Sequence, residues 1–436
     1  MENKLIKNDF IKVDSCCICK SKEINKILDM GKTALANNLV KDYKYSLIQK
    51  KYDLCLIICK KCNHIQLNTS VNEEILFNNY AYKTGISNTM INHFKSFTEH
   101  LCKYFDVKNQ SYSKVKVLDI GSNDSVLLDI LSKKGFKTFG VEPASNLADQ
   151  SSHNIFNGFF NKKTLAKISK QFGNFDVITA NNVFAHTRDL PQFIENMSLL
   201  LKKDGLISIE VQYLPELIKN CYVDMIYHEH TSYHHLKPLH KLFKDNNLTL
   251  NSVSNISTHG GSMRIILNKS NKNSIEFDNK IRSLEFIKND NEFDDNIINK
   301  FNLLSLKIDD IKSTLNKKIR EVLRECEILY GYSAPAKTVT LLSLLDVDII
   351  KKIEFIIEDN PLKQGNYIPS TNIPLLKTSE GTNKIKSKKS SCIIFAWNMF
   401  DEISKKIINN PRLNPNILIC PLPYPKIIRL DYAQNK

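Results

Sequence analysis

Short apolar runs alternate with amphipathic segments in two stretches of the chain, and the first lies between residues 115 and 211. Its apolar runs, which we interpret as buried strands, are VKVLDI, KTFGVE, FDVITA and LISIEV (115–120, 137–142, 175–180 and 206–211). Helices are predicted between them at 125–134, 165–172 and 192–202, and another is predicted before them at 91–105. Apolar runs of this length are typical of parallel strands covered by helices on both faces. The alternation therefore predicts a doubly wound sheet with a ligand crevice at the carboxyl ends of its strands.

The second stretch follows a polar, charged section from 271 to about 327, where the apolar residues have helical spacing and predict long connecting helices. Beyond it, the predicted strands are EILYGY, KIEFIIED, SCIIFAW and ILICPL (327–332, 352–359, 391–397 and 417–422). Helices are predicted near 338–345 and 399–408. We therefore expect an α/β fold class in three parts. These are a small N-terminal module over 1–75, a central Rossmann-like sheet domain over 76–270 and a second open α/β domain over 271–436.

Net charge changes this picture little. The formal charge is +15, from 61 Lys and Arg against 46 Asp and Glu, and a basic protein can attract a polyanion such as nucleic acid. Lysine is nevertheless spread from end to end, and no block of consecutive basic residues marks a tail. No apolar run approaches the roughly 18 residues of a membrane span, and MENKLIKNDF lacks the apolar region of a secretory signal. We expect a cytoplasmic protein that binds neither membranes nor nucleic acid; the sequence carries no signal for an oligomeric state.

Six of the 11 cysteines lie at or before position 62. In a reducing compartment, clustered cysteines bind metal or do chemistry more often than they form disulfides. Cys16 and Cys19 form one Cys-x-x-Cys pair, and Cys59 and Cys62 form a second. Four thiolates close a tetrahedron around Zn²⁺ and leave no position open for a substrate. The spacing therefore predicts a structural zinc site, with His64 as a lower-ranked replacement for one cysteine.

A glycine turn follows the first strand of the central domain. Gly121 lets the backbone turn tightly beneath a ligand, and Ser122, Asn123 and Asp124 lead into a helix. Glu142 stands about 20 positions further on, at the end of the next strand, where it can accept hydrogen bonds from both ribose hydroxyls of an adenosine. A dinucleotide fingerprint would read G-x-G-x-x-G, with glycines that admit a pyrophosphate. DIGSNDS has one glycine and fits S-adenosylmethionine, which carries no phosphate; the alternative is a plain strand-to-helix connection.

Acid/base side chains gather in two segments. ANNVFAH (180–186) follows a predicted strand and places Asn181, Asn182 and His186 at the mouth of the crevice. YHEHTSYHH (227–235) collects groups whose pKa values suit proton transfer near neutrality. We therefore expect catalysis at these two segments.

The arrangement of the second segment separates the possible roles. In an extended loop, Tyr227 and Glu229 would share one face while His228 and His230 share the other. A metal site is disfavoured because HEH lacks the i, i+4 spacing of helical zinc sites. A structural loop is the remaining alternative.

Together these features resemble the sugar C-methyltransferases, and the resemblance runs over almost the whole chain. Besides the two cysteine pairs, the matching motifs are ALANNLV (34–40), YAYKTGISNTM (80–90), IGSND (120–124), GVEPA (140–144), ANNVFAH, the Tyr-x-Glu-His of 227–230, HGGSMR (259–264), GYSAPAK (331–337), EDNPLKQGNYIP (358–369) and FAWNMFDEI (395–403). Each is weak alone, but so many in one order are specific. The resemblance implies a zinc module, a class I S-adenosylmethionine-dependent methyltransferase domain and a C-terminal nucleotide-sugar domain.

The resemblance also implies a reaction, methylation of a carbon beside the ketone of a deoxysugar attached to a nucleoside diphosphate. By match of position, His230 would remove the proton. Tyr227, Glu229 and His186 would be its neighbours around the sugar and the enolate. Tyr80 or Tyr82 would close over the substrate, and both are candidates for that one role.

The C-terminal domain would grip the diphosphate. Lys337 and Lys363 could neutralise it, and the backbone amides around Ser333 to Ala336 could form an anion nest. The plain alternative for either lysine is an ordinary solvated side chain. Ser125 and Ser333 stand where the family pattern carries glycine, as does Thr338; positive φ at such positions would cost about 1 kcal/mol each and could alter nucleotide preference.

Two other functions compete with this one. A zinc-bearing nucleic-acid methyltransferase would agree with the charge, but it should show a basic, aromatic-bearing surface or a base-reading motif such as NPPY, which ANNVFAH is not. A non-catalytic member of the fold could serve as a scaffold. The retained His186, Tyr227, Glu229 and His230 argue against that role.

Overall fold

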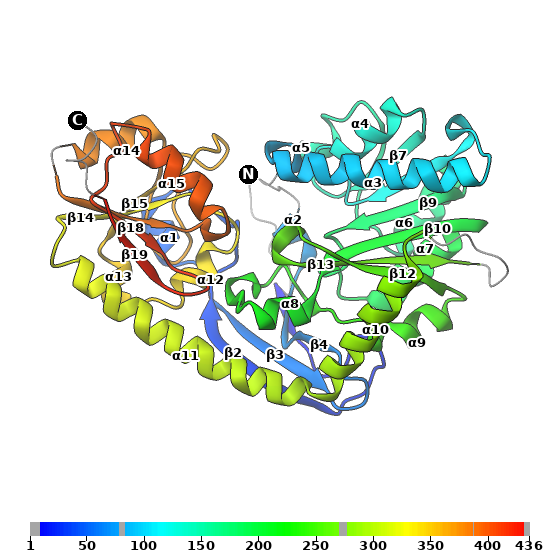
Figure 1. Cartoon of the computed structure of the whole chain (residues 1–436), viewed down its shortest axis with the longest axis horizontal. Coiled ribbons are helices and arrows are strands. Elements are labelled where there is room, and N and C mark those ends of the chain that lie inside the picture. Colours follow the sequence, from blue (N-terminus) through cyan, green and yellow to red (C-terminus); the bar gives the residue numbers. More distant parts are fainter. Residues whose placement is uncertain (1–8, 78–82, 270–276, 387, 431–436) are drawn as a thin grey trace. The chain divides into compact units, whose positions relative to one another are not determined.

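The computed structural model describes residues 9–77, 83–269, 277–386 and 388–430 (Figure 1). Its internal contacts divide the chain into two compact units. Unit 1 takes in the described residues of Met1–Ile27, Leu56–Glu216 and His230–Ile298. Unit 2 takes in those of Leu28–Cys55, Leu217–Glu229 and Asn299–Lys436. The chain therefore changes unit several times, and one of these changes falls on the peptide bond between Glu229 and His230.

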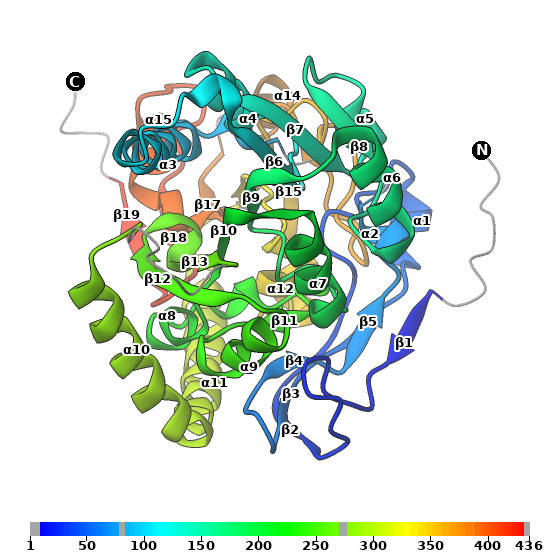
Figure 2. The same cartoon turned by 90° about the vertical axis from the view of Figure 1, so that its right-hand side faces the viewer.

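Unit 1 is built on a seven-stranded sheet with the order β12-β13-β10-β9-β6-β7-β8 (Figure 2). The strands are β6 (Lys116–Ile120), β7 (Lys137–Glu142), β8 (Asn154–Asn157), β9 (Phe175–Asn181), β10 (Leu201–Gln212), β12 (Thr249–Ile256) and β13 (Ser262–Asn268). The first five run parallel, whereas β13 is antiparallel to both β10 and β12. The expected doubly wound sheet is confirmed, and an antiparallel hairpin that the sequence pattern did not indicate extends it.

Helices cover both faces of this sheet because its strands are apolar on both faces. Val117 of β6 packs in one core with α3 (Asn88–Val107) and α4 (Val126–Lys133), while the neighbouring Leu118 faces the opposite core. The opposite face is covered by α6 (Lys162–Phe172), α7 (Leu190–Leu200), α9 (Lys237–Asp245) and α10 (Lys280–Asp295). The short α5 (Ser145–Ala148) follows β7. Because helices cover both faces of the sheet, the polar crevice can lie only at the ends of its strands.

The N-terminal residues form two small sheets. One has the order β11-β4-β3-β2 and contains β2 (Ile24–Thr33), β3 (Tyr52–Cys59), β4 (Ile65–Leu67) and β11 (Ser232–Tyr233); in the other, β1 (Phe10–Lys12) pairs with β5 (Thr69–Val71). The short helices are α1 (Tyr43–Leu47) and α2 (Glu73–Phe77). The unit boundaries fall inside β2 and β3. Residues Leu28–Cys55 belong to unit 2, whereas the start of β2 and the end of β3 belong to unit 1.

Unit 2 contains a six-stranded sheet with the order β16-β15-β14-β17-β18-β19. Its strands are β14 (Ile328–Tyr332), β15 (Ile353–Ile357), β16 (Leu375–Leu376), β17 (Ser390–Ile394), β18 (Ile417–Cys420) and β19 (Lys426–Arg429), and only β19 pairs antiparallel. The helices are α11 (Ile297–Val322), which runs beside the sheet, α12 (Thr338–Leu342), α13 (Val347–Ile350), α14 (Thr378–Ile385) and α15 (Phe400–Ile408) (Figure 1). The expected second α/β sheet is confirmed. Its order reverses at β14, between β15 and β17, where such sheets bind ligands.

The long helices predicted between 271 and 327 are present as α10 and α11. The remaining helix, α8 (Leu214–Lys219), and the 3-10 turns η1 (Thr84–Ile86), η2 (Tyr112–Lys114), η3 (Val223–Met225), η4 (Thr258–Gly260) and η5 (Trp397–Met399) are short. Across the described residues, we find no helix with the length and apolar character needed to span a membrane.

Candidate active site

The turn after β6 has the tight backbone that a bound cofactor needs. Gly121 adopts φ +67°, and its N–H donates to the carbonyl of Val141 at 2.7 Å. A Cβ at this position would lie 2.4 Å from Cγ2 of Val183. Asn123 and Ser125 also adopt positive φ, +50° and +65°. A side chain at position 121 would therefore be strained and would collide, so the glycine is required by the geometry.

Glu142 closes this turn at the end of β7. Its Oε2 accepts a hydrogen bond from the amide of Asn123, and its Oε1 accepts one from the amide of Ala144, both at 2.8 Å. The side chain is buried, and burial raises the pKa of Glu142. A carboxylate oxygen can accept two hydrogen bonds, so each oxygen keeps one position for a ribose hydroxyl.

Further polar atoms at the turn suit a polar ligand. Within the described residues, Ser122 Oγ and Asp124 Oδ1 are buried and have no hydrogen-bond partner. The other oxygen, Asp124 Oδ2, accepts from the amide of Gly85 at 2.9 Å, and Asn123 Oδ1 accepts from Thr84 at 3.0 Å. A buried polar atom without a partner is costly unless a ligand or water satisfies it. The residues present therefore fit S-adenosylmethionine.

The end of β9 adds the next part of the crevice. Asn181 is the last residue of β9, and Asn182 follows with φ +56° while its amide donates to Glu210 O at 2.7 Å. Deeper in the sheet, the buried Asp119 accepts a hydrogen bond from Thr179 at 2.6 Å. Burial raises the pKa of Asp119 to about 7.

His186 and His230 lie together in unit 1. Their ring centroids are 5.0 Å apart with an interplanar angle of 63°, and His230 is only 8% exposed. The carbonyl of Ala185 accepts from the amide of Thr231 at 2.8 Å, which fastens the two loops together. Phe77 packs edge-on against His186 with centroids 5.4 Å apart. The structure therefore brings together two imidazoles from segments that are far apart in the sequence.

Glu229 belongs to unit 2, where it is 1% exposed. Its Oε1 accepts a hydrogen bond from Nδ2 of Asn37 at 2.8 Å. Tyr227 belongs to the same unit. Residues 227–229 form a bend and a turn, so the extended loop that we expected, with alternating faces, is wrong. Asn37 lies in ALANNLV, and nothing in that segment of the sequence predicts its hydrogen bond to Glu229.

Two other histidines of YHEHTSYHH, His228 and His234, are packing residues, whereas His235 pairs with Asp294 at 2.8 Å. His228 has an Nε2 3.3 Å from the carbonyl oxygen of Asp53, and burial lowers its pKa to about 4. His234 stacks on Phe184 with centroids 4.9 Å apart, and burial lowers its pKa to about 3. Both rings are therefore neutral near pH 7. Tyr80 and Tyr82 lie outside the described residues.

In unit 2, Ser333 adopts φ +64°, which matches the positive φ considered for this position. Lys363 is buried and donates from Nζ to the carbonyl of Ala334 at 2.8 Å. The amide of Ser333 donates to the carbonyl oxygen of Ile357, and the amide of Ala334 donates to Oε2 of Glu358. Two of the amides expected to form the anion nest are therefore already hydrogen-bonded within the chain.

Lys337 has a different environment. Its Nζ lies 3.5 Å from the carboxylate of Asp224 and 4.2 Å from the ring centre of Trp397. Burial lowers the pKa of Lys337, an effect that Asp224 opposes. Trp397 Nε1 donates to the same carboxylate at 2.6 Å. The charge of Lys337 is therefore already balanced within unit 2.

The four predicted cysteines converge. The sulfur atoms of Cys16, Cys19, Cys59 and Cys62 all lie within 4.8 Å of one another. Each pair is followed by the same backbone turn, in which Lys20 N donates to the carbonyl of Cys16 and Asn63 N to that of Cys59. Four thiolates at this separation fit a tetrahedral zinc. Among the described residues this is the one group of metal-ligating side chains found, so His64 is not needed as a ligand.

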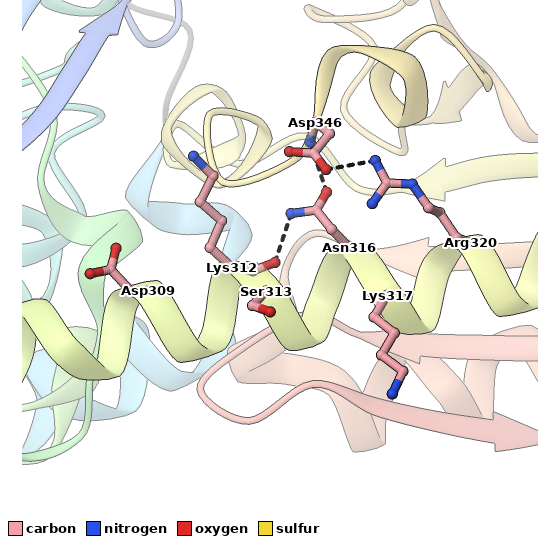
Figure 3. Close-up of a pocket in the computed structure, with 7 residues that line it drawn as sticks. All are labelled: Asp309, Lys312, Ser313, Asn316, Lys317, Arg320 and Asp346. Carbon is pink, nitrogen blue, oxygen red and sulfur yellow. Dashed lines mark hydrogen bonds and ion pairs between the residues drawn. The ribbon is translucent and has the colours of Figure 1, made fainter.

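A surface cavity of about 410 Å³ lies elsewhere, along α11 (Figure 3). Asn316 donates to Lys312 O and to Leu344 O, and its Oδ1 accepts from the amide of Asp346. Arg320 pairs with Asp346 at 2.6 Å. The interactions of Asn316 and Arg320 with Asp346 tie α11 to the loop before α13, and no predicted site residue lines the cavity.

Comparison with known families gives three matches in chain order. A zinc binding domain matches residues 16–77, a methyltransferase domain matches 73–253 and a C-methyltransferase C-terminal domain matches 257–423. C-methyltransferase NovU of Streptomyces niveus is 26% identical over 428 residues, which are 96% of this chain and 98% of that protein.

Two further similar proteins match smaller parts of this chain. The mitochondrial ubiquinone biosynthesis O-methyltransferase of Bos taurus is 30% identical over 105 residues, 22% of this chain and 28% of its own. Magnesium protoporphyrin IX methyltransferase from Synechocystis, solved with bound S-adenosylmethionine, is 13% identical with a TM-score of 0.32 over 42% of this chain and 82% of its own.

Proposed function

We propose that the substrate of this S-adenosylmethionine-dependent C-methyltransferase is a nucleotide-linked keto-deoxysugar. In this proposal the enzyme deprotonates the carbon beside the ketone, C3 of a 4-keto sugar, and methylates it. The observation that carries the chemistry is the His186–His230 pair in the same unit as the cofactor turn.

His230 would be the base. A proton on carbon beside a ketone is a weak acid, so its removal needs a positioned base and donors where negative charge grows on the ketone oxygen. The hydrogen bond from the amide of Thr231 to the carbonyl of Ala185 joins the two loops and holds the imidazole of His230 against His186. His186 would therefore orient His230 or donate toward the developing enolate.

The cofactor residues would be Gly121, Ser122, Asn123, Asp124, Glu142, Asn181 and Asn182. Bound S-adenosylmethionine supplies an electrophilic methyl group whose C–S bond breaks as the new C–C bond forms. Glu142 would hold the ribose, and the unpartnered atoms of Ser122 and Asp124 would bind the polar remainder. The chain contributes alignment and exclusion of water.

Unit 2 would hold the substrate. The buried carboxylate of Glu229, fixed by Asn37, would accept a sugar hydroxyl, with Tyr227 beside the sugar. Tyr80 or Tyr82 would close over it. Lys363 has two N–H groups beyond the one given to Ala334 and is the better candidate for the diphosphate. Lys337, paired with Asp224, would act by supporting the turn at Ser333.

The test starts with the wild-type, zinc-loaded protein. Incubation with S-adenosylmethionine and a panel of nucleotide-linked 4-keto sugars should give a product heavier by about 14 mass units, as expected when CH₃ replaces H. No mass gain with any keto sugar would contradict the proposal.

The role of His230 has a separate test. Without cofactor, the wild type should exchange the proton beside the ketone for solvent deuterium. His230→Asn should lose this exchange while it still binds S-adenosylmethionine, and His100→Asn, an exposed histidine of α3, should keep it. Unchanged exchange in His230→Asn would remove His230 from its role.

A further inference from the structure

The segment that follows His230 pairs with a strand of the zinc binding domain, which matches residues 16–77. In β11, Ser232 lies opposite Gln66 of β4 (Figure 2). The contact continues toward His230, because the carbonyl of Thr231 accepts from the amide of Leu67 at 3.0 Å. All three residues of β4 are buried. The backbone on the C-terminal side of His230 therefore takes its position from β4.

The second cysteine pair leads into β4 along the chain. Cys62 comes shortly before Ile65, where β4 begins. The amide of Cys59 donates to the carbonyl of His64 at 3.0 Å, which closes the turn that contains this pair. His64 Nε2 also lies 3.3 Å from Oγ of Ser232 in β11. No additional side chain is needed to connect the second pair with β11.

The first cysteine pair is connected to β4 by one side chain. Oε1 of Gln66 accepts a hydrogen bond from the amide of Cys17 at 2.8 Å, and its Nε2 donates to the carbonyl of Ser15 at 2.9 Å. These two peptide groups stand on either side of Cys16, one of the four clustered cysteines. Gln66 is 4% exposed. A glutamine amide carries both an acceptor and donors at its end, so one buried side chain bonds both peptide groups.

Thr231 connects β4 with the histidine pair. Its amide donates to the carbonyl of Ala185 at 2.8 Å, and its hydroxyl donates to the carbonyl of Thr187 at 3.0 Å. These two acceptors are the neighbours of His186 in the chain. Thr231 is therefore held by the His186 loop and by β4 together, and it directly follows His230, whose ring centre lies 5.0 Å from that of His186.

We propose that Gln66 is a positioning residue for proton removal, which transmits the zinc-bound conformation of the first cysteine pair through β4 and β11 to His230. This inference rests on the proposed function and gives the zinc binding domain a part in it. Gln66 contacts neither substrate nor cofactor in this proposal and acts only by keeping the imidazole of His230 in place. A displacement of about 1 Å in a reacting group can slow a reaction about 100-fold.

Gln66→Met keeps the length of the side chain and removes both hydrogen bonds. In zinc-loaded protein without cofactor, deuterium exchange beside the ketone should be about 10- to 100-fold slower than in the wild type. We expect kcat to fall with it, whereas the KM for S-adenosylmethionine and the zinc content measured by elemental analysis should not change. This split separates a positioning role from a general loss of structure.

Gln192→Met is the matched control, because it makes the same substitution in unit 1. The amide of Gln192 donates to Glu195 and Asn196 within α7. This variant should exchange deuterium as the wild type does. Gln66→Glu keeps an oxygen that can accept from the amide of Cys17, so it should recover part of the exchange lost in Gln66→Met. It also replaces Gln66→Met, with the same expected direction against the wild type, if the methionine variant does not fold.

A second measurement needs no substrate. In protein with isotope-labelled histidine, the NMR signals of the His230 imidazole can be assigned by their absence in His230→Asn. These signals should shift in zinc-loaded Gln66→Met and remain unchanged in Gln192→Met. Unchanged His230 signals in Gln66→Met overturn the inference, and so does an unchanged exchange rate.

The inference and the proposed function can fail separately. Normal exchange in both the wild type and Gln66→Met would overturn the inference and leave the function standing. A wild type that neither exchanges the proton nor methylates any keto sugar would overturn the function. The His230 signals would then still show whether Gln66 positions the imidazole.

Discussion

Asn37 donates a hydrogen bond from Nδ2 to Oε1 of Glu229 at 2.8 Å, although the two residues are 192 positions apart in the sequence. Both belong to unit 2. A buried carboxylate is costly unless donors satisfy it, and Glu229 is 1% exposed. The segment between β2 and β3 therefore supplies a fixed partner for a carboxylate that we place beside the sugar.

Asn37→Ala should lower kcat about 10- to 100-fold, because a hydrogen bond to a charged group contributes about 1.5–3 kcal/mol. The KM for S-adenosylmethionine should not change. Asn38→Ala is the matched control, since Asn38 is exposed and its Nδ2 donates to the amide oxygen of Gln49 at 3.1 Å rather than to a carboxylate. Asn37 has φ +56°, so Asn37→Gly separates strain from the lost donor. Equal kcat values in Asn37→Gly and the wild type would show that the contact with Glu229 does not matter.

One zinc ion should bind per chain through the four clustered thiolates. Cys59→Ser and Cys62→Ser should each lose most of the metal and lower the melting temperature, because structural zinc contributes folding free energy directly. Cys326→Ser, far from the cluster in the sequence, should keep both. Elemental analysis with thermal unfolding checks this, and full zinc content in Cys59→Ser would argue against the site.

Asp119 should make stability depend on pH. Its pKa is raised to about 7 in the folded chain from an ordinary 3.8, so the unfolded chain releases this proton at lower pH than the folded chain does. The free energy of unfolding should therefore fall as pH rises from about 4 to 7, by at most about 4 kcal/mol from this group. Asp119→Asn removes the effect, and Asp204→Asn, an exposed carboxyl, does not. Urea unfolding without cofactor at pH 5 and pH 7.5 measures both. An equal difference between Asp119→Asn and wild type at the two pH values would contradict the assignment.

Ser125→Gly and Ser333→Gly should each stabilise the protein by up to about 1 kcal/mol, because both serines adopt positive φ where glycine is unstrained. Ser132→Gly, in the right-handed backbone of α4, should instead destabilise it. Differential scanning calorimetry would show opposite shifts in melting temperature. A lower melting temperature in both positive-φ variants would mean that contacts such as Ser125 Oγ to Ser151 Oγ outweigh the strain.

The sequence predicted the strands and helices whose buried residues form a continuous or periodic apolar pattern. Val117 and Leu118 face opposite cores, so β6 is apolar throughout and recognisable. The hairpin β12–β13 was missed because β13 buries polar residues such as Arg264, which a buried Glu210 pairs at 2.9 Å. From the sequence alone, a buried polar residue that has a buried partner cannot be distinguished from an exposed polar residue.

The same limit applies to the site. The spacing of the cysteines indicated their cluster because both pairs carry the local geometry of a ligand pair. Nothing local distinguishes His228 and His234, which are buried and neutral, from His230, which lies beside His186. Contacts such as Asn37 to Glu229 and Ala334 to Glu358 depend on the folded chain and were visible only there.

Glu142 belongs to unit 1, whereas Asn37 and Glu229 belong to unit 2. The proposed contacts to the methyl donor and to the sugar are therefore carried by separate structural units. Engineering of a new acceptor sugar can then be directed at positions 37 and 229, and engineering for enlarged donor analogues at position 142, so that each library leaves the other set of contacts unchanged.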